Sequence, residues 1–297
     1  MENPSSEISP NLPTERLDPN EPDLSWSASD FEQKLGFRGG RFTSVNNVVT
    51  FLFAVVLTVV FFVAVIYGLN NWDPTKFIAE MFLRGIIPIP IVFFFFWCMA
   101  ILFVKSRKLA LQRKALDLKP FPDRPDFLLN PETAQAVIAA IQKLVDDSRH
   151  FMLLNRIERA LSNLRNIGHI GDVSDILQAQ ADYDEGHQES SYRLVNGFIW
   201  AIPVLGFIGT VLGLSDAIGG FGATLAASGE DINALKESLA GITGGLSTAF
   251  ETTLIALVAA LIVQVKMTFL QQKESIFLDD CNDYCHAHVV SKLKLIG

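Results

Sequence analysis

The chain has 297 residues, of which 49% are hydrophobic and 19% are charged, and its net charge at pH 7 is −8. The acidic balance argues against a nucleic-acid partner, and three cysteines give no disulfide framework. Four apolar stretches are each long enough to cross a bilayer, which takes about 20 residues, and they argue against a soluble protein. The sequence therefore predicts an all-α membrane protein with four transmembrane helices and long helices that extend into a cytoplasmic helical region.

The N-terminal region is polar. Residues 1–30 carry seven acids, one arginine and five prolines, and they contain no apolar stretch of the kind found in a signal peptide. This composition predicts a disordered acidic tail. Residues 31–44 have the pattern of a short amphipathic lead-in to the first span.

Residues 45–104 are predicted to form two peripheral transmembrane helices. The stretches Phe42 to Trp72 and Gly85 to Val104 contain no Asp, Glu, Lys or Arg, which makes both candidates for spans. Pro88 and Pro90 stand near the start of the second stretch, so we expect either a kink or a late helix start there.

Residues 105–193 are predicted to form a cytoplasmic helical region. It begins with six basic residues between Lys105 and Lys119, whereas the loops between paired spans contain few. Because basic residues gather on the cytoplasmic side of membrane proteins, we expect this region and both termini to be cytoplasmic.

Residues 194–268 contain the third and fourth spans with a periplasmic connection, and residues 269–297 continue as a cytoplasmic C-terminal helix. The third span includes Pro203 and a strip of glycines at three- and four-residue steps, Gly206, Gly209 and Gly213. Such a strip allows close helix packing. Thr210 borders the strip, so it is either part of an ion pathway or a packing residue bonded to its own backbone.

The fourth span contains one charged residue, Glu251. A carboxylic acid at membrane depth is costly and normally faces a bundle interior or a watery path, so Glu251 is either part of an ion pathway or a structural carboxyl near the outer interface. Thr248 shares its helix face, while Thr253 lies about 160° round the helix. Thr248 and Thr252 would add hydroxyls for a sodium pathway.

The segments GFIGTVLGL and STAFETTLIALVAAL in these two spans are similar to the signature of the MotA/TolQ/ExbB proton-channel family. The four-span plan resembles the MotA arrangement. By this resemblance, Thr210 and Thr253 match the two pore threonines. An acid of the ExbB type would fall at the position of Thr248, whereas this chain has its acid at Glu251.

The resemblance implies a proton-conducting subunit of a stator-like rotary motor in the bacterial inner membrane. It implies a homopentamer around two copies of a single-span MotB/ExbD/TolR-like partner, which supplies the proton-carrying Asp. A sodium-driven motor and a non-conducting membrane scaffold remain alternatives. No phosphate loop, catalytic triad or paired-carboxylate arrangement stands out, so we expect neither an enzyme nor a cofactor.

Two further clusters have two interpretations each. Arg156, Glu158 and Arg159 form either a force-transmitting surface, by analogy with MotA, or an ordinary solvated face. Cys281, Cys285 and His288 share a helix face, but a structural zinc site usually needs four ligands. Helix packing is therefore the preferred interpretation of this second cluster, and no metal is expected.

Overall fold

The computed structural model describes residues 24–34, 36, 40, 42–68, 76–118, 120–122, 127–162, 164, 170–227 and 232–294. Within these ranges the regular structure consists of helices, with two isolated backbone bridges, Leu24 to Val145 and Leu129 to Leu293. Four helices are long and apolar enough to cross a membrane. The predicted all-α membrane fold with four spans is therefore confirmed.

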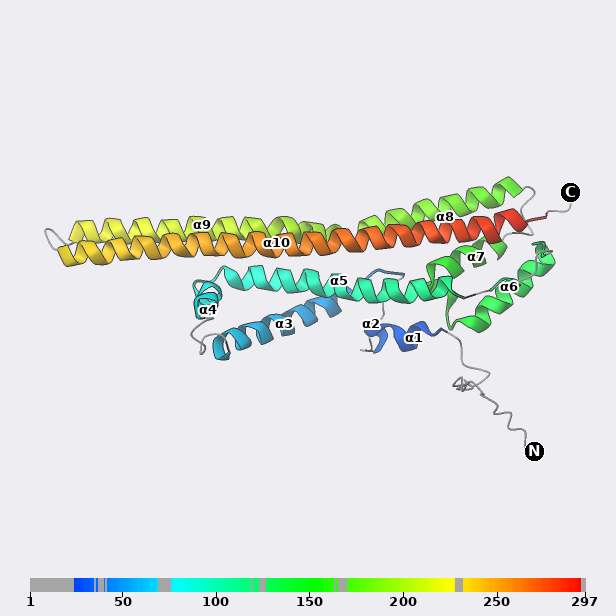
Figure 1. Ribbon diagram of the computed structural model, residues 1–297, viewed down its shortest axis with the longest axis horizontal. Helices are drawn as coiled ribbons and strands as arrows, with labels where there is room; N and C mark the ends of the chain where they lie inside the picture. Colours follow the sequence, from blue (N-terminus) through cyan, green and yellow to red (C-terminus); the bar gives the residue numbers. More distant parts are fainter. Residues whose placement is uncertain are drawn as a thin grey trace, which may run out of the picture.

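Two long antiparallel helices dominate the molecule (Figure 1). They are α9 (Arg193–Ala227) and α10 (Ile232–His288), and they lie side by side along most of their length. The 57 residues of α10 correspond to about 85 Å at 1.5 Å per residue. Helix α8 (Ile170–Ser191) leads into α9 with one intervening turn residue, Tyr192. The pair α8–α9 and the single helix α10 thus both run from the polar end of the molecule into its apolar part.

The first two spans form a hairpin beside α10 (Figure 1). They are α3 (Asn47–Tyr67) and α5 (Pro88–Leu116), and the short helix α4 (Lys76–Leu83) precedes α5. The Trp97 indole N–H donates to the Thr50 hydroxyl at 3.2 Å and ties the two spans together. Helix α5 begins at Pro88, the position where a missing N–H costs no hydrogen bond, so the late helix start is the outcome observed.

A compact helical cluster forms the polar end of the molecule. It contains α6 (Pro131–Leu144), α7 (Met152–Ser162) and two single 3-10 turns, Ser148–His150 and Val290–Lys292. These elements pack with α8 and the last turns of α10 around one apolar core. The core includes buried side chains from α6, α7, α8 and α10, so packing fixes the ends of α8 and α10 relative to each other.

Residues 24–30, which the sequence predicts as part of a disordered tail, are folded in the structure. We call residues 24–46 the N-terminal arm; residues 1–23 of the predicted tail lie outside the described residues. The arm contains the single-turn helices α1 (Trp26–Ser29) and α2 (Phe31–Lys34). Trp26 is only 1% exposed and stacks on His150 with ring centroids 5.4 Å apart.

Asp146 holds the first turn of the arm in place. Its carboxylate accepts hydrogen bonds from the backbone N–H groups of Trp26 and Ser27 at 2.9 and 3.0 Å, and from the hydroxyls of Ser25 and Ser27. Partial burial opposes ionisation of this carboxyl, but the hydrogen bonds outweigh it and lower the pKa of Asp146 to about 2.

Buried charges hold the rest of the arm against α5 and α10. The Lys108 ammonium contacts the Glu32 carboxylate at 2.5 Å, and Glu32 also accepts from the backbone N–H of Asn46 at 2.7 Å. One helix turn away, Lys105 pairs with Glu274 of α10 at 3.4 Å. Glu274 accepts two further hydrogen bonds, from the hydroxyls of Thr43 and Tyr192. Each buried carboxylate thus has a cation and neutral donors, as burial requires.

Candidate functional site: a threonine pair between two spans

Glycines of α9 create the close contact with α10. A Cβ atom placed on Gly206 would lie 2.5 Å from the Ala256 Cβ, and one on Gly209 would lie 2.5 Å from the Thr252 hydroxyl oxygen. A Cβ on Gly213 would lie 2.9 Å from the Gly245 carbonyl oxygen. Because real Cβ atoms do not approach other atoms this closely, any side chain at these positions would push the two helices apart.

The close contact brings Thr210 and Thr253 together. Their hydroxyl oxygens lie 2.5 Å apart, and both side chains are half-buried. Both oxygens also lie near the Gly206 carbonyl oxygen, at 3.2 Å for Thr210 and 3.1 Å for Thr253. The two threonines that match the family motif therefore form one site within a single subunit.

The chemistry of this pair follows from its hydrogen bonds. A hydroxyl donates one hydrogen bond and has two acceptor lone pairs. When Thr253 donates to the Gly206 carbonyl, Thr210 donates to Thr253, and its own lone pairs stay available to a water molecule or a protonated carboxyl. The pair can therefore interact with a passing proton carrier without holding a charge of its own.

The hydroxyls of Thr248 and Thr252, which are also predicted for an ion pathway, bond to backbone carbonyls of their own helix. Thr252 is 2% exposed, and its hydroxyl bonds to the Thr248 and Ala249 carbonyls at 3.1 and 3.0 Å. The Thr248 hydroxyl bonds to the Gly244 carbonyl at 3.0 Å. Pro203 lies within α9 and is half-buried. Since proline has no N–H, it removes one helical hydrogen bond two turns before Thr210.

Glu251 faces away from the threonine pair. Its carboxylate, 11% exposed, accepts a hydrogen bond from the Arg84 guanidinium at 3.1 Å and another from the Ser247 hydroxyl at 2.7 Å. Arg84 follows α4 and also pairs with Glu80 at 3.5 Å. Glu251 thus joins α10 to the turn between the first two spans, on the side of α10 opposite Thr253.

Sequence reasoning missed Arg84 and Ser247 as partners of Glu251. A membrane-depth acid normally has a cationic partner, and Arg84 is the arginine at the end of the hairpin beside it. That rule was the signal available in the sequence.

The predicted force-transmitting cluster does not lie together on the surface. Arg156 is 1% exposed, and its guanidinium donates to the Asp184 carboxylate at 2.6 Å and to the Asn282 side chain. It joins α7 to α8 and α10 inside the polar end, so its expected surface role is corrected to an internal one. Glu158 accepts from the Ser148 hydroxyl, and only Arg159 of the three is exposed.

The cysteines lie in the core of the polar end. Cys281 and Cys285 are buried, and the His288 ring lies 4.4 Å from the Tyr284 ring and 5.8 Å from the Phe121 ring, measured between centroids. In the described part of the chain, no three His, Cys, Asp or Glu side chains are grouped so as to hold a metal ion. These contacts favour the packing interpretation.

A comparison with protein families matches residues 152–281 to the MotA/TolQ/ExbB proton channel family. This part of the chain belongs to that family. The matched region covers α7, α8, α9 and α10 as far as Cys281, and it includes the threonine pair and Glu251. The comparisons with curated proteins and with solved structures gave no match. The four apolar helices and this match together support a multi-pass membrane protein with a region of the MotA/TolQ/ExbB type.

Proposed function

We propose that the chain is the proton-conducting subunit of a rotary motor in the bacterial inner membrane, coupled to a single-span MotB/ExbD/TolR-like partner. The observation that supports this most directly is the contact of the Thr210 and Thr253 hydroxyls between two spans of one subunit. The family match supports the proton as the conducted ion and a single-span protein as the partner. In this proposal the protein is not an enzyme and both of its termini are cytoplasmic.

The assembly that we propose is a ring of five copies around two partner spans. Large apolar side chains of α9 and α10 remain exposed in the single subunit, among them Trp200 at 79%, Phe207 at 65% and Phe250 at 63%. Exposed apolar surface of this extent inside candidate spans contacts either lipid or other helices. It leaves ample surface for neighbouring copies and for the partner.

In the proposed mechanism the partner carries the proton on its Asp, and the threonine pair meets that group. A protonated carboxyl donates a hydrogen bond to the Thr210 oxygen, whereas an ionised one accepts the Thr210 hydroxyl proton, which then no longer bonds to Thr253. The two states of the partner therefore prefer different positions relative to the pair. Proton entry and exit would shift the populations of these positions and step the ring around the partner.

The test is proton flux into liposomes that contain the chain and its single-span partner. We expect Thr210→Val and Thr253→Val to lower the flux while the complex stays assembled. Thr243→Val is the matched control, because this threonine also lies in α10 but is exposed and bonds to the Leu239 carbonyl of its own helix. Unchanged flux in both test variants would overturn the proposed pathway.

A non-conducting scaffold is the second candidate. It is favoured by the bonds from both threonine hydroxyls to the Gly206 carbonyl, which also fit a purely structural role. The same liposomes separate the two functions, because a scaffold gives no flux in the wild type under a proton or a sodium gradient. Flux under the sodium gradient alone would identify the sodium-driven motor.

A further inference from the structure

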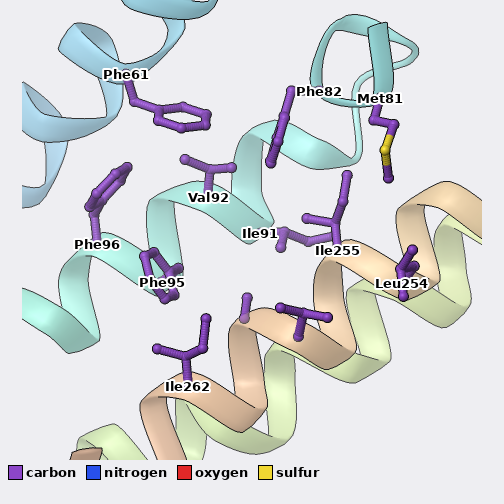
Figure 2. A pocket seen from close by; sticks show the side chains of 12 residues that line it. Phe61, Met81, Phe82, Ile91, Val92, Phe95, Phe96, Leu254, Ile255 and Ile262 are labelled. Atoms are coloured by element: carbon purple, nitrogen blue, oxygen red, sulfur yellow. The ribbon is translucent and has the colours of Figure 1, made fainter. Parts of the chain in front are cut away.

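A cavity of about 320 Å³ lies between the first two spans and α10. Figure 2 shows side chains from α3, α4, α5 and α10 pointing into it, including Phe61, Phe82 and Phe95. It is separate from the threonine pair, because Thr210 and Thr253 lie in the contact between α9 and α10 and do not line the cavity.

The lining of the cavity is entirely apolar. It consists of aliphatic and aromatic side chains and one thioether, that of Met81. A water molecule needs two to four polar partners, so this space stays dry, and an engineered apolar cavity of about 150 Å³ takes up benzene. If the larger space remained empty, its lining would lose many dispersion contacts. The lining therefore suits a hydrocarbon group.

The shape of the cavity selects an extended chain. Leu254, Val258 and Ile262 follow one another at four-residue steps along α10, and they are 54, 47 and 42% exposed. This line is about 12 Å long. The floor of the cavity is buried, with Ile91 of α5 at 0% and Ile255 of α10 at 9% exposed. The cavity is thus a groove parallel to α10, and its open side continues into the apolar surface that the spans present to the bilayer.

One end of the groove is polar. Glu251 lies one turn before Leu254 and pairs with Arg84, which also contacts Glu80 at 3.5 Å; the side chains of Arg84 and Glu80 are 39% and 47% exposed. A guanidinium binds phosphate oxygens through charge-assisted hydrogen bonds. An apolar groove that ends at a guanidinium and an exposed carboxylate matches a lipid with a hydrocarbon chain and a zwitterionic headgroup, whose phosphate faces Arg84 and whose ammonium faces Glu80.

We propose that this groove binds one acyl chain of a membrane phospholipid, with the headgroup on the side of Arg84. Helices α5 and α10 pack directly against each other, so a helix of another copy, about 10 Å across with its side chains, cannot enter between them. The bilayer supplies acyl chains along the whole open side. The bound chain fills the space between the peripheral hairpin and α10.

The test measures retained phospholipid per subunit by native mass spectrometry after purification in mild detergent. Ala259→Phe fills the groove from α10, because Ala259 lines it and is 9% exposed. Leu257→Phe is the matched control, since Leu257 is 53% exposed on the same helix and does not line the groove. We expect Ala259→Phe to lose about one phospholipid per subunit relative to the wild type and the control.

A second measurement keeps the proposal testable if Ala259→Phe folds poorly. Ile262→Trp blocks the open side of the groove. After delipidation, added dioleoyl phosphatidylethanolamine should raise the Tm of the wild type but not that of Ile262→Trp. Equal lipid retention in all variants, retention of a free fatty acid instead, or loss of subunit association without loss of lipid would each overturn the proposal. Proton flux is not read out, so failure here leaves the proposed function standing.

Discussion

The hydroxyl oxygens of Thr210 and Thr253 lie 2.5 Å apart, although 43 residues separate them in the chain. The contact exists because Gly206 lets the backbone of α9 approach α10, where a Cβ would lie 3.2 Å from the Thr253 Cα. Small residues and polar hydroxyls thus act together, and each depends on the other. This dependence leads to the first two predictions.

The two hydroxyls should behave as one functional unit. We expect Thr210→Val and Thr253→Val each to reduce proton flux roughly tenfold, the effect of losing about 1.4 kcal/mol of hydrogen bonding. The double variant should be little worse than either single one, because groups that act as a unit are not additive. Thr253→Ser, which keeps the hydroxyl, should retain flux. Two independent reductions that multiply in the double variant would contradict the pairing.

The contact at Gly206 should be sensitive to a single methyl group. Gly206→Ala would place its Cβ 2.5 Å from that of Ala256, and overpacking of this kind costs about 1–3 kcal/mol. Adding Ala256→Gly removes the opposing atom and should restore most of the thermal stability in detergent. Gly219→Ala is the control, because a Cβ there meets no atom within 4 Å. Failure of the second change to rescue the first would place the strain elsewhere.

Glu251 should matter for stability and not for flux. Arg84→Gln leaves the carboxylate without its cation and should cost roughly 1–3 kcal/mol, less than for a fully buried pair because Arg84 is partly exposed. Adding Glu251→Gln should recover part of this loss, since no charge then remains unpaired. Thermal unfolding of the four members of this cycle measures the coupling. An assembled Glu251→Gln complex that conducts no protons would instead return Glu251 to the ion pathway.

The sequence predicts the helical architecture well because span length and charge distribution determine it locally. The long run of α10 follows from the absence of Pro and Gly after Gly245, whereas α9 continues through Pro203 and its glycines. The partners of individual side chains are set by tertiary packing. Helix periodicity places Glu251 and Thr253 on different faces, but it does not say that one face meets Arg84 and the other meets Thr210.

Two departures from the sequence-based expectation have a common physical reason. Residues 24–30 have too few apolar residues to predict a folded segment. Arg156 belongs to a charged run whose composition is that of a solvated helix face. Each is held by a distant group. Asp146 binds the arm across 120 residues, and Asp184 binds Arg156 across 28. Local patterns do not reveal charges and caps that are satisfied at such distances.

Docking of the N-terminal arm should depend on pH through Asp146. Its pKa in the structure, about 2, is lower than the ordinary value of 3.8, so the docked state binds fewer protons than the released one. The resulting stabilisation is complete above about pH 4 and is lost as the pH falls towards 2. The fluorescence of Trp26, taken as the difference from a Trp26→Phe variant, should shift to the red over this range.

The Asp146→Asn variant should weaken arm docking at neutral pH. The amide keeps the shape but accepts hydrogen bonds less strongly than a carboxylate. Asp182→Asn is the control, because this exposed carboxylate on α8 accepts a hydrogen bond from the Gln178 side chain of its own helix. If both variants leave the Trp26 signal unchanged, Asp146 does not hold the arm.

The hydrogen bond between Thr43 and Glu274 can form only late during synthesis of the chain. Glu274 is translated 231 residues after Thr43, which takes roughly 10–50 s at the usual rates of elongation. The first span therefore enters the membrane while its own N-terminal flank still lacks this partner. Closure of the arm over Lys105 and Glu274 waits until all four spans have been made. The contact between Thr43 and Glu274 therefore forms only in chains synthesised through Glu274, and a truncated product that ends before α10 lacks it.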